Sequence, residues 1–286
     1  MAISAFVPEV WSAELLVELE KSLVYGAPGV VNRDYEGEIS QFGDTVHVVT
    51  LADPTVDDYT AHSDITIDEV DDSDQTLVID EAKYFAFEVD DIEQRQARSG
   101  GAILTEQARK AAYVLRDTAD QFIASLMATD VDSGNDLGEE TLTEVDEAYD
   151  YLVDLAVLLD EANVPTEGRF AIVTPAYHGL LLKDDRFVAA GDAPGATTRA
   201  NGMVGEAAGF SIRKSNNAPD GSTTGKIQIA GYAGATSYAE QINRTEATRK
   251  EKGFADIVKG LHLYGAEVFR PTGLATLDAI IDIGGT

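Results

Sequence analysis

The sequence predicts an α+β protein in which one long helix lies between two strand-rich regions. The helix is predicted over residues 102–128, where apolar side chains recur every three or four positions. The strand-rich regions cover residues 30–89 and 236–270, where β-branched and aromatic residues partly alternate with polar ones. Of the 286 residues, 44% are hydrophobic, which is enough to form the core of one large domain or two smaller ones.

The first 90 residues are predicted to form a helix followed by extended structure. Apolar residues at helical spacing predict an amphipathic helix over residues 9–24. Polar turn clusters separate the strands predicted over 30–89. From Asp53 to Glu93 there are fifteen acidic residues and one basic residue, Lys83. We therefore expect this region to be largely solvated or to contact another molecule.

The helix predicted over 102–128 should bury one face. Its apolar stripe includes Leu104, Leu115 and Leu126. At a rise of 1.5 Å per residue, this helix is roughly 40 Å long. The opposite face is predicted to be exposed and carries charged residues: Glu106, Arg109, Lys110, Arg116, Asp117 and Asp120.

A mixed helix and strand region follows. Residues 130–140 are predicted to be a loop, and Thr141 with Glu144 forms a capping-box pattern for a helix ending near Ala162. The remaining predicted elements are the strand RFAIVTP, a helix with Thr174 as N-cap and Pro175 at its first position, a mobile segment 189–209, the strands GFSIRKS and KIQIAGY, the hairpin 236–270 and a packed tail GLATLDAIIDI.

The composition excludes several classes of function. The formal net charge is −30, from 51 acidic and 21 basic residues, and this argues against a nucleic-acid-binding surface, because phosphates are bound by clustered Lys and Arg. Only nine of the basic residues are Lys, a composition that suits high salt. There is no Cys, so disulfide and thiolate chemistry are excluded. We expect neither a signal peptide nor a membrane span, since the start is acidic and the longest apolar run is LAVLL.

The motifs associated with catalysis are absent or incomplete. GSTTGK at 221–226 resembles a phosphate-binding loop, but it is one residue short and has Ile227 where Ser or Thr would bind magnesium, so a hairpin turn is predicted. Neither GxGxxG nor GxSxG occurs. The four histidines are too widely spaced for a zinc motif and are expected to be structural or on the surface: His47, His62, His178 and His262.

An acidic loop was considered as a calcium site. The EF-hand register fails, because Asn135 occupies the position of the required Gly and Thr141 that of the bidentate Glu. A solvated loop is therefore favoured over calcium ligation by its carboxylates: Asp130, Asp132, Asp136, Glu139 and Glu140. We predict no catalytic, cofactor-binding or metal-binding residues and no enzymatic activity.

Four blocks of sequence, taken in order, carry a family resemblance. They are VPEVWSAELLVELEKSLVYG continued by VVNRDYEGEISQFGDTVHV, then FAIVTPAYHGLLLKDDRF, NGMVGEAAGFSIRKSNNAP and FADIVKGLHLYGAEVFRPTGLATL. Together they resemble the major capsid proteins of tailed bacteriophages and tailed archaeal viruses.

The resemblance implies the Hong Kong 97-type capsid fold. This fold has an N-terminal arm, an extended β loop, a peripheral domain with a spine helix and an axial domain. The expected boundaries are 1–30 for the arm, 31–89 for the loop, 90–138 and 236–286 for the peripheral domain, and 139–235 for the axial domain.

The function implied is that of a major capsid protein in the virion. Such a protein assembles with itself into hexamers and pentamers and forms an icosahedral shell around double-stranded DNA, which it does not bind sequence-specifically. Portal, scaffolding and decoration proteins are the implied partners, and assembly is expected in the host cytoplasm. No Lys lies between Lys21 and Lys83, so the isopeptide cross-link of the namesake phage is not expected. Two alternatives remain, which are an encapsulin-like cellular compartment and an acidic metal-dependent enzyme.

A charged contact between subunits is also predicted. The turn of the 236–270 hairpin is rich in basic residues, and the obvious partner is the acidic extension of a neighbouring subunit. The basic residues are Arg244, Arg249, Lys250, Lys252 and Lys259, and the acidic ones are Asp57, Asp58, Asp71, Asp72 and Asp74. The alternative is a solvated turn, because an exposed ion pair contributes only about 0–1 kcal/mol.

Overall fold

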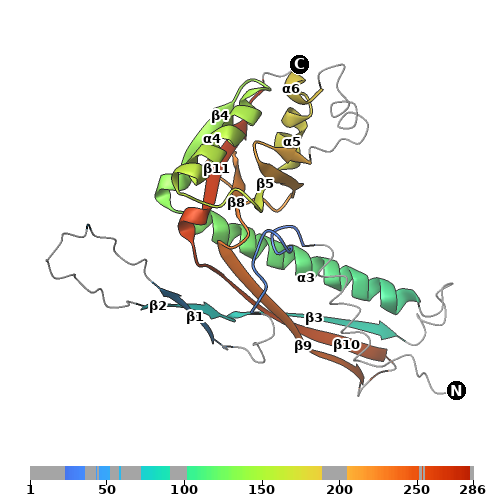
Figure 1. The fold of residues 1–286 in the computed structure, drawn as a ribbon. Helices are drawn as coiled ribbons and strands as arrows, with labels where there is room; N and C mark the ends of the chain where they lie inside the picture. Colours follow the sequence, from blue (N-terminus) through green and yellow to red (C-terminus); the bar gives the residue numbers. More distant parts are fainter. Residues whose placement is uncertain are drawn as a thin grey trace, which may run out of the picture.

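The computed structural model shows an elongated layer with a more compact unit above it (Figure 1). The residues that it describes are 23–35, 43, 45–51, 58, 72–90, 102–188, 205–250, 253 and 255–283. Most of the predicted helix over 9–24 and most of the predicted mobile segment 189–209 therefore lie outside the described residues, and Leu23 and Val24, which are described, are not helical. No helix among the described residues is long and apolar enough to span a membrane.

The elongated layer is a three-stranded antiparallel sheet covered by one helix. The strand order is β3 (Glu81–Asp90), β10 (Ala255–Val268) and β9 (Thr236–Arg249), so the predicted hairpin forms the larger part of the sheet. Helix α3 (Ala102–Thr129) runs along this sheet, as Figure 1 shows, and matches the predicted helix closely. Its buried residues include Leu115, Ala119, Ile123 and Met127, which recur at helical spacing.

A second antiparallel ribbon extends from the same layer. Strands β1 (Thr45–Leu51) and β2 (Asp72–Val78) pair with each other. Val46, Leu77 and Ile79 form a small core with Ala239 and Leu263 of the long hairpin. The base of the ribbon is thereby attached to the hairpin. Between β1 and β2 only residue 58 is described, so most of the predicted tip lies outside the described residues.

The compact unit is a six-stranded mixed sheet. Its order is β4-β11-β8-β5-β7-β6. Along its strand β5, successive side chains point alternately into two separate hydrophobic cores. Ala171 and Val173 lie with helices α4 and α5, whereas Phe170 and Ile172 lie with α3. The bounds are β4 Asp136–Leu142, α4 Glu147–Glu161, β5 Arg169–Val173, α5 Pro175–Leu181, α6 Asp185–Val188, β6 Glu206–Ala207, β7 Phe210–Lys214, β8 Lys226–Tyr232 and β11 Leu274–Ile281, with 3-10 turns at Ser133–Asn135 and Pro271–Gly273.

The predicted loop and capping box before α4 are wrong. Residues 136–142 form strand β4, which pairs in parallel with β11, and the helix begins only at Glu147. The carboxylate of Glu147 accepts hydrogen bonds from the backbone N–H groups of Thr143 (2.6 Å) and Glu144 (3.0 Å). The Glu147 carboxylate therefore has the capping role that the sequence pattern had assigned to Thr141 and Glu144. Pairing with β11 overrides the local signal.

The predicted start of α5 is correct. The Thr174 hydroxyl accepts a hydrogen bond from the backbone N–H of Tyr177 at 3.3 Å, and Pro175 occupies the first helical position. The glycine-rich approach to β7 also has a structural explanation. Ala208 and Gly209 both have positive φ, 49° and 81°, and they connect β6 to β7 as a two-residue hairpin turn.

Candidate assembly surfaces

One buried carboxylate holds the segment 23–35 against helix α3. Asp120 is 1% exposed and accepts hydrogen bonds from the backbone N–H groups of Val24, Tyr25 and Gly26, at distances of 3.0 to 3.3 Å. Burial raises the pKa of the Asp120 carboxyl, although these N–H groups and Arg116 favour its charged form. The prediction that Asp120 lies on an exposed face is therefore wrong.

A second buried carboxylate joins the segment 23–35 to the long hairpin. Glu240 on β9 pairs with the Arg33 guanidinium and accepts a hydrogen bond from the Tyr238 hydroxyl at 2.8 Å. Its Oε2 also lies 3.1 Å from Nε2 of His262 on β10. The Glu240 side chain is 1% exposed and that of His262 is fully buried. This network and Asp120 together attach the segment 23–35 to both halves of the elongated layer.

The stability contributed by Glu240 is expected to disappear in acid. Burial alone would raise its pKa, but His262, Arg33 and Tyr238 hold the pKa below the ordinary value of 4.5. A carboxyl whose pKa is lowered by folding stabilises the fold above its unfolded pKa and loses that contribution as pH falls through the folded pKa. The difference in unfolding free energy between the wild type and Glu240→Gln should therefore shrink below pH 4.5.

Urea unfolding of unassembled subunits over a pH series would measure this difference. Glu88→Gln is the matched control, because Glu88 is exposed and pairs with Lys250 at the surface. A difference for Glu240→Gln that stays constant down to about pH 3 would contradict the prediction.

The GSTTGK segment holds a carboxylate of its own chain. Asp278 on β11 accepts hydrogen bonds from the backbone N–H of Ser222 at 2.6 Å and from its hydroxyl at 2.9 Å. A Cβ on Gly221 or Gly225 would lie 1.8 or 2.0 Å from Asp278 Oδ1, so both positions require glycine. The loop is closed by the Gly221–Gly225 backbone hydrogen bond. A buried carboxylate at this place is incompatible with a bound phosphate.

The acidic residues considered for calcium serve separate structural roles. Asp132 accepts a hydrogen bond from Gly134 N, and Asp136 accepts one from the Thr276 hydroxyl. Glu139 accepts hydrogen bonds from Ser222 and Thr223. Within the described ranges, no three acidic or histidine side chains are grouped as a metal site would require.

The histidines occupy the kinds of position that were predicted. His47 is exposed on β1, whereas His178 and His262 are buried. Burial, together with the nearby charge of Lys214, lowers the pKa of His178. His62 lies outside the described residues.

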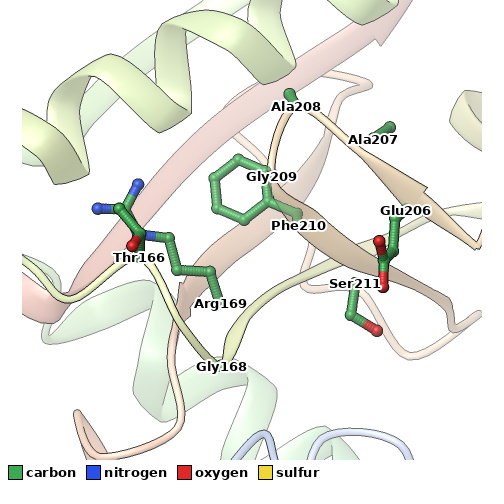
Figure 2. A pocket seen from close by; sticks show the side chains of 9 residues that line it. All are labelled: Thr166, Gly168, Arg169, Glu206, Ala207, Ala208, Gly209, Phe210 and Ser211. Atoms are coloured by element: carbon green, nitrogen blue, oxygen red, sulfur yellow. The ribbon is translucent and has the colours of Figure 1, made fainter.

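A cleft lies between the β6–β7 turn and the segment before β5 (Figure 2). Its wall includes Gly168, Arg169, Gly209 and Phe210. The Arg169 guanidinium donates to the carbonyl oxygens of Val164 and Pro165 and pairs with Asp160, so its charge is already used within the subunit. The cleft lies beside β6, the edge strand of the compact sheet.

Of the charged residues predicted to meet between subunits, those that the structure describes form two groups far apart within one chain. Lys250 forms an ion pair with Glu88 at 2.7 Å, and Lys259 and Arg249 are exposed. Arg244 lies in β9, and Lys252 is outside the described residues. The hairpin turn and the β1–β2 ribbon are at opposite ends of the elongated layer in Figure 1.

Of the predicted acidic partners, only three are described. Asp58 is exposed, and Asp72 and Asp74 are in β2. Asp57 and Asp71 lie outside the described residues. Because the chain itself does not bring the two groups together, a contact between them would require a second subunit.

This arrangement of an elongated layer, a ribbon and a compact sheet corresponds to a known family. The family of phage capsid proteins matches residues 74–277, which is more than half of the chain. The chain belongs to the phage capsid protein family. No curated protein sequence matches it.

Solved structures support the assignment of this chain to the capsid protein family. It is 31% identical to a protein of Mycobacterium phage Che8, with a TM-score of 0.73 over 87% of this chain and 89% of that one. The capsid of Cyanophage P-SCSP1u is 18% identical, with a TM-score of 0.66 and coverage of 85% of both chains. The SrpI encapsulin of Synechococcus elongatus is 12% identical, with a TM-score of 0.56 over 84% of this chain and 83% of that one. The capsid protein therefore has the Hong Kong 97-type fold.

The buried carboxylates of the capsid protein were not predicted from its sequence. Asp120, Glu240 and Asp278 each lie beside residues that the hydrophobic pattern places in the core. In a chain with 51 acidic residues, their positions were indistinguishable from those of surface acids. The only available signal was that Glu240 and Asp278 each interrupt an apolar strand face, whereas Asp120 lies among the charged positions of its helix.

Proposed function

We propose that the protein is the major capsid protein of a tailed virus, which forms hexamers and pentamers and closes them into an icosahedral shell around double-stranded DNA. The observation that supports this most directly is the 31% identity to the Che8 protein across most of both chains. The partners would include a portal and a scaffolding protein, and a decoration protein on the outer surface. Assembly would take place in the host cytoplasm.

We keep for this function the division that the sequence suggested, although β3 pairs with the hairpin of the elongated layer and β11 pairs within the compact sheet. We assign residues 1–30 to an arm, 31–89 to an extended loop, 90–138 with 236–286 to a peripheral domain, and 139–235 to an axial domain. The compact sheet would then surround the capsomer axis, and the elongated layer would reach its neighbours. An encapsulin-like compartment is disfavoured, because that match has the lower identity and TM-score.

Electron microscopy of particles formed by the full chain would test the proposal. The expected result is closed icosahedral shells, and particles recovered from infected or lysogenic hosts should contain double-stranded DNA. A soluble monomer under all assembly conditions would overturn the proposal. Shells filled with a cargo enzyme and free of DNA would favour the compartment.

Charge reversal at the hairpin turn should impair assembly. We expect Lys250→Glu with Lys252→Glu to lower shell yield, because each lattice contact between this turn and the acidic extension of a neighbour would become repulsive. Lys226→Glu is the matched control: like Lys250, Lys226 pairs with an acidic residue of its own chain, Asp220, but it lies on β8 of the compact sheet and not at the hairpin turn. The yield would be measured by sedimentation of particles, and an unchanged yield would indicate that the turn is merely solvated.

Salt should stabilise the assembled shell. Every subunit carries a formal charge of −30, and repulsion among many exposed charges acts near or beyond the Debye length of roughly 8–10 Å, where salt screens it most. Ion pairs at short range are screened less. We therefore expect the temperature of disassembly, followed by light scattering, to rise toward molar salt or with millimolar magnesium or calcium. A steady fall with salt would show that ion pairs between subunits dominate.

A further inference from the structure

Arg213 on β7 is a half-buried cation without a carboxylate partner. Its guanidinium donates a hydrogen bond to the carbonyl oxygen of Pro28 at 3.3 Å, and it forms no ion pair with the residues that the structure describes. Burial lowers the pKa of this guanidinium. Arg33 and Arg169, which are also shielded from solvent, each pair with a carboxylate of their own chain. Arg213 therefore lacks the anion that normally accompanies a shielded arginine.

The surroundings of Arg213 form one edge of the compact sheet, which we call the β7 edge (residues 207–219). This stretch contains two basic residues, Arg213 and Lys214, and no acidic residue. Lys214 is exposed and also forms no ion pair within the described ranges. The cleft of Figure 2 lies along the same strand, and Ser211 in its wall shares a face of β7 with Arg213, because alternate side chains of a strand point the same way. The β7 edge thus combines positive charge with a recess.

The opposite end of the same sheet is acidic. Its last strand is β4, and α4 packs on β4 and β11, as Figure 1 shows. Residues 130–161 contain twelve acidic residues and no Lys or Arg. On α4, the exposed residues Asp154, Val157 and Glu161 recur at helical spacing and therefore lie on one face, which we call the α4 face. Val157 is 46% exposed, and neither carboxylate forms an ion pair within the described part of the chain.

We propose that the β7 edge of one subunit docks against the α4 face of a second copy in the same capsomer, where Arg213 pairs with Asp154 or Glu161 of that copy. This inference rests on the proposed function. The two surfaces are opposite in charge, and each supplies the counter-charge that the other lacks. They lie at opposite ends of one sheet, and a contact between two different surfaces of identical subunits can close into a ring. Val157 then forms an apolar centre with a charged rim, as in other protein interfaces.

An exchange of charges tests this pairing. Arg213→Glu is expected to lower the yield of capsomers and shells by about tenfold or more, because like charges that face each other in an interface repel strongly. Asp154→Arg with Glu161→Arg, two exposed changes, should lower the yield by themselves, so the test does not depend on how Arg213→Glu folds. The three changes together should restore most of the yield. Arg270→Glu is the matched control, since Arg270 is an exposed arginine between β10 and β11 and belongs to neither surface.

The absence of Cys from the chain allows a second test that does not depend on charge. Val157→Cys and Asn216→Cys would be introduced singly and together, and assembled particles would be treated with a short bis-maleimide. Asn216 is exposed in the β7 edge. The double variant should give a covalent ladder up to pentamers and hexamers on a denaturing gel, and each single variant should give none. Val157→Cys with Lys110→Cys is the control, because Lys110 is exposed on α3 of the elongated layer.

Several results would overturn the inference. Dimers from Val157→Cys alone would show that α4 faces α4 of another copy. An equally strong ladder from the control pair would show that the cross-links report random collision. Normal shells without a ladder, or a charge exchange that restores no yield, would show that the β7 edge does not meet the α4 face. If the wild-type chain forms neither capsomers nor shells, the proposed function itself fails, so the two failures are distinguishable.

Discussion

Replacing Asp120 with alanine is expected to lower the free energy of unfolding of the subunit by about 3 kcal/mol or more. The carboxylate satisfies three backbone N–H groups, of Val24, Tyr25 and Gly26, and a buried donor left without a partner costs about 1–3 kcal/mol. Asp120→Asn should cost less, because the amide oxygen can still accept some of these bonds. Urea unfolding followed by circular dichroism would measure both changes.

The control for this pair of variants is Asp154→Ala. Asp154 is exposed on α4, so its removal should change stability by less than about 0.5 kcal/mol. Hydrogen exchange should also show that the segment 23–35 loses protection in Asp120→Ala while α4 keeps it. Equal losses from Asp120→Ala and Asp154→Ala would mean that the segment 23–35 is held by its apolar contacts alone.

Gly265→Ala should be similarly damaging, with an expected loss of about 3 kcal/mol, at the upper end of the usual cost of overpacking. A Cβ at this position of β10 would lie 2.2 Å from the carbonyl oxygen of Val78 and 3.1 Å from Ile79 Cα. Both obstacles are backbone atoms, which cannot rotate away. The end of β2 would have to move off the hairpin, and the base of the β1–β2 ribbon would move with it.

Gly205→Ala is the matched control for this substitution. Gly205 has no atom within 4 Å of the place where a Cβ would stand, and its φ is not in the left-handed region. The two variants would be compared by urea unfolding and by shell yield, since the ribbon is part of the proposed extended loop. If Gly265→Ala unfolded at the same urea concentration as Gly205→Ala, the ribbon would not be fixed against β10 as described.

The elements that the sequence identified correctly are those whose signal is local. Helix α3 was predicted from the recurrence of Leu115 and similar residues, and β5, the Thr174 cap and the β9–β10 hairpin were predicted from short contiguous patterns. In each of these elements, the apolar side chains recur with the period of the helix or strand and lie on its buried face. Tertiary contacts then reinforce the local preference and leave its boundaries almost unchanged.

The errors occurred where a distant segment determined the outcome. Residues 136–140 of strand β4 were predicted to belong to a loop, and Thr141 and Leu142 to the start of a helix. They form a strand because β11, more than 130 residues away in sequence, offers a parallel partner. Asp120 was placed on the surface by its charge and by its position in the helical repeat. It is buried because Val24 and its neighbours, 94 to 96 positions away, bring unpaired N–H groups to that side of the helix.

The sequence by itself therefore determined the class of fold, the long helix and hairpin, and, through four ordered blocks, the capsid family. Only the tertiary structure decided which carboxylates are buried and what the GSTTGK loop encloses. The physical reason is that apolar periodicity depends only on the residues of one helix or strand. The environment of a charged group depends instead on donors and partners supplied by segments far away in the chain.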